Sequence, residues 1–195
     1  MVLQITAIVI AIFSLFVAGL TAWLTLLRKG TIKMTQPTMI FFGRDPEGMS
    51  KVFLRTLLYS TSKRNQIVES MFVKVKRGET LQMFNLWVYG DTYLARGSGI
   101  NVGADGLVCN HHFLTPKVGT TYAFLPSGYT MEVYASLVGR RSPLRLSTIN
   151  LTLSDEHATA MRNKDVGVFF DWDPDSQHYH AHVDERPKEK MEQAI

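Results

Sequence analysis

The chain has 195 residues, and 21 Lys and Arg against 17 Asp and Glu give it a formal net charge of +4. Proteins that bind nucleic acid usually concentrate more positive charge on one part of the chain, so this balance argues against a nucleic-acid partner. The single cysteine, Cys109, excludes an internal disulfide and agrees with a reducing compartment.

The first element is an uncharged stretch from Leu3 to Leu27, directly followed by Arg28 and Lys29. As a helix it is about 37 Å long, enough to cross a hydrocarbon layer of about 30 Å. The alternative is a cleaved secretory signal, which has a basic start, a shorter apolar run and small residues before the cleavage site. Bulky residues, Trp23 and Leu24, stand where small ones are expected. We therefore interpret this stretch as a transmembrane anchor in the lipid bilayer.

Basic residues lie only on the C-terminal side of this helix, at Arg28, Lys29 and Lys33. The positive-inside rule then places everything after the helix in the cytoplasm, attached to a single-pass anchor.

Small and polar residues recur along the helix at alternating spacings of three and four. They are Gln4, Ala7, Ala11, Ser14, Ala18, Thr21 and Thr25. Helices associate in lipid through close backbone approach and interhelical hydrogen bonds, which small, Ser and Thr side chains allow. This helix-association stripe predicts self-association or pairing with another membrane protein, and its 3.5-residue period favours a left-handed arrangement.

We divide the chain into an anchor (1–29), a juxtamembrane linker (30–36), a β-sandwich domain (37–186) and a disordered C-terminal tail (187–195). Short runs rich in Val, Phe, Tyr, Leu and Thr alternate with turn residues at intervals of about ten, which is typical of all-β domains. The expected strands are Thr38–Phe42, Lys51–Ser60, Gln66–Lys76, Thr80–Tyr89, Tyr93–Val102, Leu107–Leu114, Thr121–Leu125, Tyr129–Gly139, Leu144–Leu153, Val166–Trp172 and His178–Val183.

One segment, Ser154–Asn163, favours a short helix because Ser154 can cap its start and acidic residues follow. No crossover helices separate the other strands, so two packed antiparallel sheets are expected rather than a parallel α/β sheet.

Two sequence stretches carry a resemblance. Asp165-Val166-Gly167-Val168-Phe169 resembles the Asp-x-Gly-x-Tyr corner of immunoglobulin-like domains, with Phe169 in place of the tyrosine and Asp171 in place of the cysteine. The stretch Leu125–Val133, with Pro126, Gly128 and Tyr129, looks like the start of a strand in many immunoglobulin-like and transthyretin-like modules. Both imply an immunoglobulin-like sandwich without implying an activity.

The junction from Thr21 to Gly30, running into Met34–Thr38, also resembles a group of small bacterial single-pass membrane proteins of unassigned function. This resemblance implies a bacterial inner-membrane location and carries no chemistry.

Three histidines, His178, His180 and His182, alternate along the last expected strand and therefore share one face. A row of imidazoles could bind a divalent metal, but the first and third lie about 13 Å apart on a strand, too far to share one ion. We interpret them as a polar outer face.

Two further patterns resemble metal sites and have simpler explanations. Asp171-Trp172-Asp173-Pro174-Asp175 opens like a calcium loop, yet Ser176 and His182 occupy the positions of the required glycine and acid, so a β-turn is expected. Cys109-Asn110-His111-His112 suggests copper, but the chain has no histidine upstream of His111 and no methionine close after it. A half-buried strand cysteine is expected instead.

Basic residues form three clusters. We interpret each cluster either as a solvated face or as a surface that is attracted to anionic lipid headgroups. The clusters are Lys63-Arg64, Lys74/Lys76-Arg77 and Arg140-Arg141 with Arg145.

No hydrolase elbow, phosphate loop or zinc-protease motif occurs, so we expect no catalytic residues, no metal and no cofactor. The sequence thus predicts a membrane-anchored β-sandwich that acts as a binding or assembly module with an unidentified protein partner. A metal-binding or redox sandwich and a tethered sensor or effector of bacterial stress or defence remain alternatives.

Overall fold

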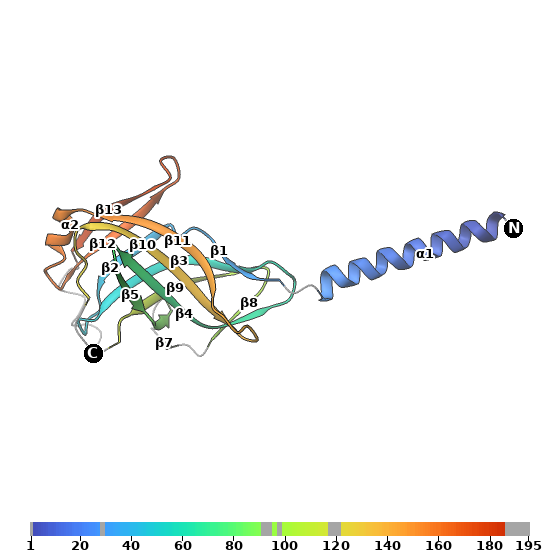
Figure 1. Ribbon diagram of the computed structural model, residues 1–195, viewed down its shortest axis with the longest axis horizontal. Coiled ribbons are helices and arrows are strands. Elements are labelled where there is room, and N and C mark those ends of the chain that lie inside the picture. The colour runs from blue at the N-terminus through green and yellow to red at the C-terminus, as the bar shows by residue number, and fades with distance from the viewer. Residues whose placement is uncertain (1, 28–29, 91–94, 97–98, 117–121, 186–195) are drawn as a thin grey trace.

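The computed structural model describes residues 2–27, 30–90, 95–96, 99–116 and 122–185. Helix α1 (Val2–Ala22) continues into a π-helical turn (Trp23–Leu27) and projects from one end of a β-sandwich (Figure 1). Within the described residues, one helical segment, Val2–Thr25, is long and apolar enough to span a membrane, with a mean hydropathy of 2.5 and none of it buried.

The β-strands form two antiparallel sheets, so the expected all-β sandwich is confirmed. The larger sheet has the order β13 (His178–Glu185), β12 (Val166–Asp173), β2 (Met39–Arg44), β3 (Ser50–Ser60), β9 (Leu107–Leu114), β6 (Leu86–Tyr89) and β7 (Ala95–Arg96), and β1 (Ile32–Met34) also pairs with β3. The smaller sheet has the order β11 (Leu144–Leu153), β10 (Ser127–Leu137), β4 (Gln66–Arg77) and β5 (Thr80–Phe84), with β8 (Ile100–Val102) on β4.

The core lies between the sheets and follows from alternation along the strands. On β4, Met71, Val73 and Val75 are buried, whereas the intervening Lys74 is half-buried and Lys76 exposed. Val73 faces Val133 of β10 in the sheet register, and both are fully buried. Successive strand residues point to opposite faces, so this alternation places the apolar side chains inside.

Strand β1 lies inside the expected linker, residues 30–36. Lys33 pairs with Tyr59 of β3, and the backbone of Thr61 donates to the carbonyl of Thr31 at 2.9 Å. Backbone groups of this segment find strand partners on β3, so the folded domain begins within a few residues of the anchor.

The expected strand Thr80–Tyr89 is wrong as one element. It divides at Asn85 into β5, which belongs to the smaller sheet, and β6, which belongs to the larger. A continuous run of strand-forming residues does not reveal a change of sheet, because both halves have the composition of a strand.

Three other expectations need qualification. Tyr122–Leu125 is irregular rather than a strand, and Thr121 lies outside the described residues. The expected strand Tyr93–Val102 contains β7 and β8, while residues 93–94 and 97–98 are not described. The expected tail, 187–195, is likewise outside the described residues.

The expected helix is confirmed as α2 (Asp155–Ala160), which connects β11 to β12. Its cap, Ser154, accepts a hydrogen bond from the backbone nitrogen of His157 at 3.2 Å. Helix α2 lies at the end of the sandwich opposite α1 (Figure 1).

Candidate functional site

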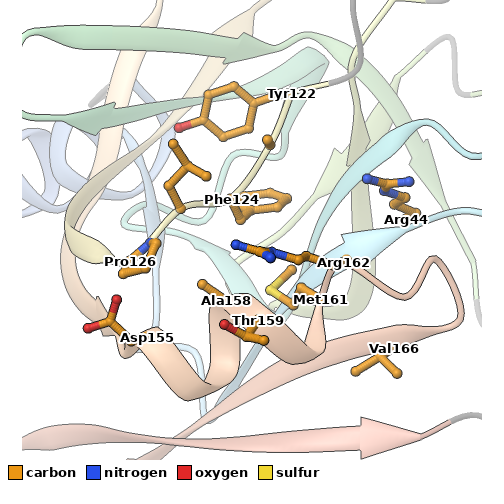
Figure 2. Close-up of a pocket in the computed structure, with 13 residues that line it drawn as sticks. Arg44, Tyr122, Phe124, Pro126, Asp155, Ala158, Thr159, Met161, Arg162 and Val166 are labelled. Carbon is orange, nitrogen blue, oxygen red and sulfur yellow. The ribbon is translucent and has the colours of Figure 1, made fainter.

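A pocket of about 150 Å³ lies beside α2, at the end of the sandwich away from α1 (Figure 2). One wall is the irregular segment 122–126, and the opposite wall is α2 with the turn that follows it. The end of β2, at Gly43 and Arg44, and the start of β12, at Val166, complete the lining. Three regions distant in sequence, at residues 43–44, 122–126 and 155–166, therefore meet here.

The 122–126 wall is fixed by hydrogen bonds although it belongs to no sheet. The hydroxyl of Ser50, which is fully buried, donates to the carbonyl of Tyr122 at 2.7 Å. The Tyr129 hydroxyl accepts from the backbone nitrogen of Leu125 at 2.8 Å and donates to its carbonyl at 2.5 Å. These bonds replace the ladder that a strand would supply, so the wall is preorganised.

Phe124 anchors the same wall in the core. Its ring centroid lies 4.6 Å from that of Phe42 in a stacked arrangement and 5.1 Å from that of Tyr122 in an edge arrangement. Aromatic pairs of this kind contribute roughly 0.5–1.5 kcal/mol beyond the area they bury. Only 7% of Phe124 is exposed, whereas 49% of its neighbour Leu125 is exposed at the rim.

The corner resemblance at Asp165–Phe169 has a phenylalanine where immunoglobulin-like domains have a tyrosine. Elsewhere in the chain, the Tyr129 hydroxyl donates to the carbonyl of Leu125, four residues upstream. Phe169, the residue in place of the corner tyrosine, packs against Phe41 on the outer face of the larger sheet, with ring centroids 4.8 Å apart.

Helix α2 forms the second wall by turning Ala158 and Met161 toward the core, where each is 8% exposed. Asp155 and Thr159 of the same helix also line the pocket, and both are exposed. Acidic residues in the first turn stabilise the helix through its dipole, so Asp155 has a structural reason for its position.

Two guanidinium groups dominate the charge of the pocket. The Arg162 side chain extends across it from the turn after α2, and the Arg44 side chain approaches from β2 (Figure 2). Arg162 forms no ion pair with the residues that the structure describes. Because Asp155 is the single carboxylate among the described lining residues, the pocket has an excess of positive charge.

The guanidinium groups of the lining suit an anionic ligand. Arg44 and Arg162 are the described lining residues that carry them. Arginine forks bind carboxylate and phosphate oxygens in planar, bidentate geometry. The arrangement can therefore hold an anionic group next to an apolar one.

The predicted histidine row lies on the outer face of β13, and none of its three members lines the pocket. The His182 Nδ1 lies 3.2 Å from an oxygen of Asp171, and the His180 Nε2 lies 3.3 Å from an oxygen of Asp173. These are exposed pairs, and no group of three potential ligands forms in the part of the chain that the structure describes. His178 contacts the carbonyl of Ser176 at 2.9 Å through Nδ1.

The expected turn at Asp173 is confirmed. One oxygen of this carboxylate accepts from the backbone nitrogen of Asp175 and the other from the hydroxyl of Ser176, each at 2.9 Å. These bonds hold the pKa of Asp173 below its usual value, the bond from Asp175 first. Its oxygens close the β12–β13 hairpin.

Cys109 is half-buried, as expected, but the neighbouring histidines are not ordinary strand residues. The Trp87 indole donates to His111 Nδ1 at 3.2 Å, and His111 is fully buried. Burial, assisted by the neighbouring His112, lowers the pKa of His111 to about 4. Burial and Lys51 lower the pKa of His112 to about 4 as well.

The helix-association stripe lies on α1 and its π-helical end, with none of its seven residues in the pocket. Thr21 and Thr25 donate their hydroxyl protons to the carbonyls of Val17 and Thr21, at 2.8 and 2.7 Å. Both hydroxyl protons are thus used within the helix. Thr25 lies in the π-helical turn, which is wider than an α-helical one and shifts it relative to the others.

A second hollow, of about 250 Å³, lies on the outer face of the larger sheet. It surrounds Phe41, whose ring occupies the space that side chains at Gly43 and Gly167 would fill. A Cβ added at Gly167 would lie 2.1 Å from that ring. The hollow is open and apolar, and its rings follow a cross-strand row from Phe169 through Phe41 to Phe53.

Sequence reasoning missed both arginines of the pocket. Arg44 is the last residue of β2, two positions after the expected strand Thr38–Phe42, and Arg162 lies inside the expected helix Ser154–Asn163. No spacing relates them, because the fold brings together residues more than one hundred positions apart. No known protein family and no curated protein matches the chain.

Proposed function

We propose that this protein is a membrane-anchored binding module whose sandwich holds a protein partner through the pocket beside α2. The observation that carries the proposal is the preorganised wall 122–126 facing Arg162, at the end of the domain away from the anchor. Arginine is among the residues that contribute most to protein interfaces.

The size of the pocket supports a polypeptide partner. Sites for cofactors and drug-sized ligands usually enclose about 300–1,000 Å³. A pocket of about 150 Å³ suits one inserted side chain instead. The apolar Phe124 and Met161 would contact that side chain, and Arg162 would pair with a neighbouring carboxylate. We infer an acidic segment with an apolar anchor residue as the ligand.

We propose further that the sandwich faces the cytoplasm of a bacterial cell, as a single-pass inner-membrane protein. The basic residues after the helix support this orientation by the positive-inside rule. A reporter enzyme fused after Ile195 should therefore be active on the cytoplasmic side. Activity on the other side, or a mature N-terminus near residue 22, would contradict the orientation.

Assembly through the anchor is a separate expectation. Ala11→Leu with Ala18→Leu fills the small-residue stripe and should weaken association of the anchor in a membrane two-hybrid assay, because the backbones can no longer approach closely. The matched control, Ile12→Leu with Phe16→Leu, changes bulky residues on the other side and should leave the signal unchanged. Equal signals from both variants would show that the stripe is not an interface.

The pocket is tested by photocrosslinking with the full chain in the membranes of its source organism. A benzophenone amino acid at Thr159, on the rim, should form a discrete product with one partner, identified by mass spectrometry. The control position is Thr148, an exposed threonine on β11. No product at Thr159, or the same product at both positions, would contradict the proposal.

Charge reversal shows whether that product depends on the pocket. Arg162→Glu should reduce the product about tenfold, since losing one well-placed charged contact costs about 1.4 kcal/mol or more. Lys164→Glu makes the same change of charge on an exposed residue two positions away that does not line the pocket. An equal loss in both variants would indicate a general electrostatic effect instead.

A further inference from the structure

The end of the sandwich nearest α1 carries a basic, partly apolar surface. A hollow of about 480 Å³ is lined there by Gly30, Arg64 and Arg140, among others, and no carboxylate belongs to its described lining. Lys63 and Arg141 flank it and are exposed. The surface combines the β3–β4 loop with the turn between β10 and β11.

Apolar side chains are exposed at the same place. Val138 is 61% exposed and Ile67 is 50% exposed, although a hydrogen bond from the Val138 nitrogen to the Ile67 carbonyl, 3.0 Å long, fixes the turn against β4. Nearby, Asp105 of the β8–β9 turn is an exposed carboxylate. Arg64 and Arg140 form no ion pair with it or with any other residue that the structure describes.

The anchor is held close to this surface. We call the segment that joins the anchor to Thr31 the tether. The Thr31 nitrogen donates to the Thr61 hydroxyl at 2.9 Å, which joins the end of the tether to the β3–β4 loop. A Cβ at Gly30 would lie 2.5 Å from the Ser62 hydroxyl oxygen, so the tether runs directly against that loop. Four residue steps separate Leu27 from Thr31, and a fully extended chain spans at most about 14 Å over that distance.

The short span from Leu27 to Thr31 determines what the basic surface can contact. The headgroup layer on one side of a bilayer is about 5–8 Å thick, and charges at physiological ionic strength act over about 8 Å. With the anchor in a membrane, the tether keeps the β3–β4 loop within reach of the lipid headgroups. The neighbouring β10–β11 turn, with its two arginines, lies on the same end of the domain.

We propose that this end of the sandwich docks on anionic lipid headgroups, with Lys63, Arg64, Arg140 and Arg141 binding phosphate groups and Val138 entering the interface. Docking keeps this end of the sandwich against the membrane and turns the pocket beside α2 away from it. Each basic residue near an anionic surface favours the docked state about fivefold. Removing Arg64 and Arg140 should therefore lower the ratio of docked to undocked protein about 25-fold.

The test uses the full chain in lipid nanodiscs, with Cys109→Ala and a nitroxide spin label on Val138→Cys. The ratio of the label's accessibility to oxygen over that to a water-soluble nickel chelate rises as a label enters lipid. In discs containing one part in three of phosphatidylglycerol, we expect a higher ratio than in pure phosphatidylcholine. A label on Thr159→Cys, at the other end of the domain, should give the same ratio in both lipids.

Two charge-matched variants complete the test. Arg64→Gln with Arg140→Gln should abolish most of the rise at Val138, whereas Lys76→Gln with Lys164→Gln, which removes two exposed charges elsewhere, should preserve it. Identical ratios in the two lipids, or a rise that survives the arginine substitutions, would overturn the proposal. Circular dichroism of each variant verifies that the sandwich remains folded. A loss of folding in the arginine variant would also overturn it, because these exposed side chains are assigned to lipid and not to the core.

Discussion

Acidification from pH 6.5 to pH 4 should lower the free energy of unfolding by about 3 kcal/mol through His111 alone. Burial lowers the pKa of this histidine from 6.5 to about 4 in the folded protein. One pKa unit corresponds to about 1.4 kcal/mol, so a difference of about 2.5 units gives this magnitude. His111 therefore makes the folded sandwich sensitive to mild acid.

The sign follows from which state binds the proton. Between pH 6.5 and pH 4 the unfolded chain protonates His111 and the folded chain does not, so stability falls as the pH is lowered through this window. Well above pH 6.5 both states are neutral at this site. In the folded state, Nδ1 of His111 accepts a hydrogen bond from the Trp87 indole. A proton on Nδ1 would also break that hydrogen bond. His112 acts in the same direction.

Urea unfolding of the full chain in non-ionic detergent, followed by tryptophan fluorescence at several pH values, measures this effect. His111→Gln keeps an acceptor for Trp87 without the titration, so its stability should depend less steeply on pH. His178→Gln, on the exposed face of β13, should retain the slope of the unchanged protein. A wild-type slope in His111→Gln would assign the acid sensitivity to other groups.

Phe42→Ala should lower the free energy of unfolding by about 3–5 kcal/mol, because the substitution leaves a cavity that a well-packed core fills only partly. Phe42 is fully buried and contacts three aromatic rings. Its ring centroid lies 4.6 Å from that of Phe124, 5.0 Å from that of Phe170 and 5.7 Å from that of Tyr129. Both side chains that hold the pocket wall, Phe124 and Tyr129, therefore lose support.

The matched control is Phe72→Ala on the outer face of the smaller sheet. Phe72 is half-buried and stacks on Tyr134 at 5.0 Å, so its loss should cost about 1 kcal/mol. The same urea titration compares the two variants, and hydrogen exchange of the Leu125 amide reports on the pocket wall. Equal losses of stability, or unchanged exchange at Leu125 in Phe42→Ala, would contradict this account of the wall.

Alternation predicted the strands well where one face meets the core and the other meets water. In β4 and β10 the buried and exposed residues follow the two-residue period along most of each strand, and the turns at Gly78 and Gly139 have the positive φ angles that favour glycine. The prediction of one strand over Thr80–Tyr89 failed at Asn85, where the chain changes sheets while its strand-forming composition continues. Strand prediction failed again at Tyr122–Leu125, which has the composition of a strand but forms none, because its aromatic side chains pack against other rings instead.

The sequence by itself determined the apolar helix, the class of the fold and the positions of most turns, because each depends on local spacing and on residues with restricted backbone geometry. Only the tertiary structure decided the pocket, the burial of His111 and the basic end beside the anchor. Arg44, Phe124 and Arg162 meet because β2, the 122–126 segment and α2 converge at one end of the sandwich. Such contacts depend on how the two sheets pack, and no local pattern in the chain encodes that packing.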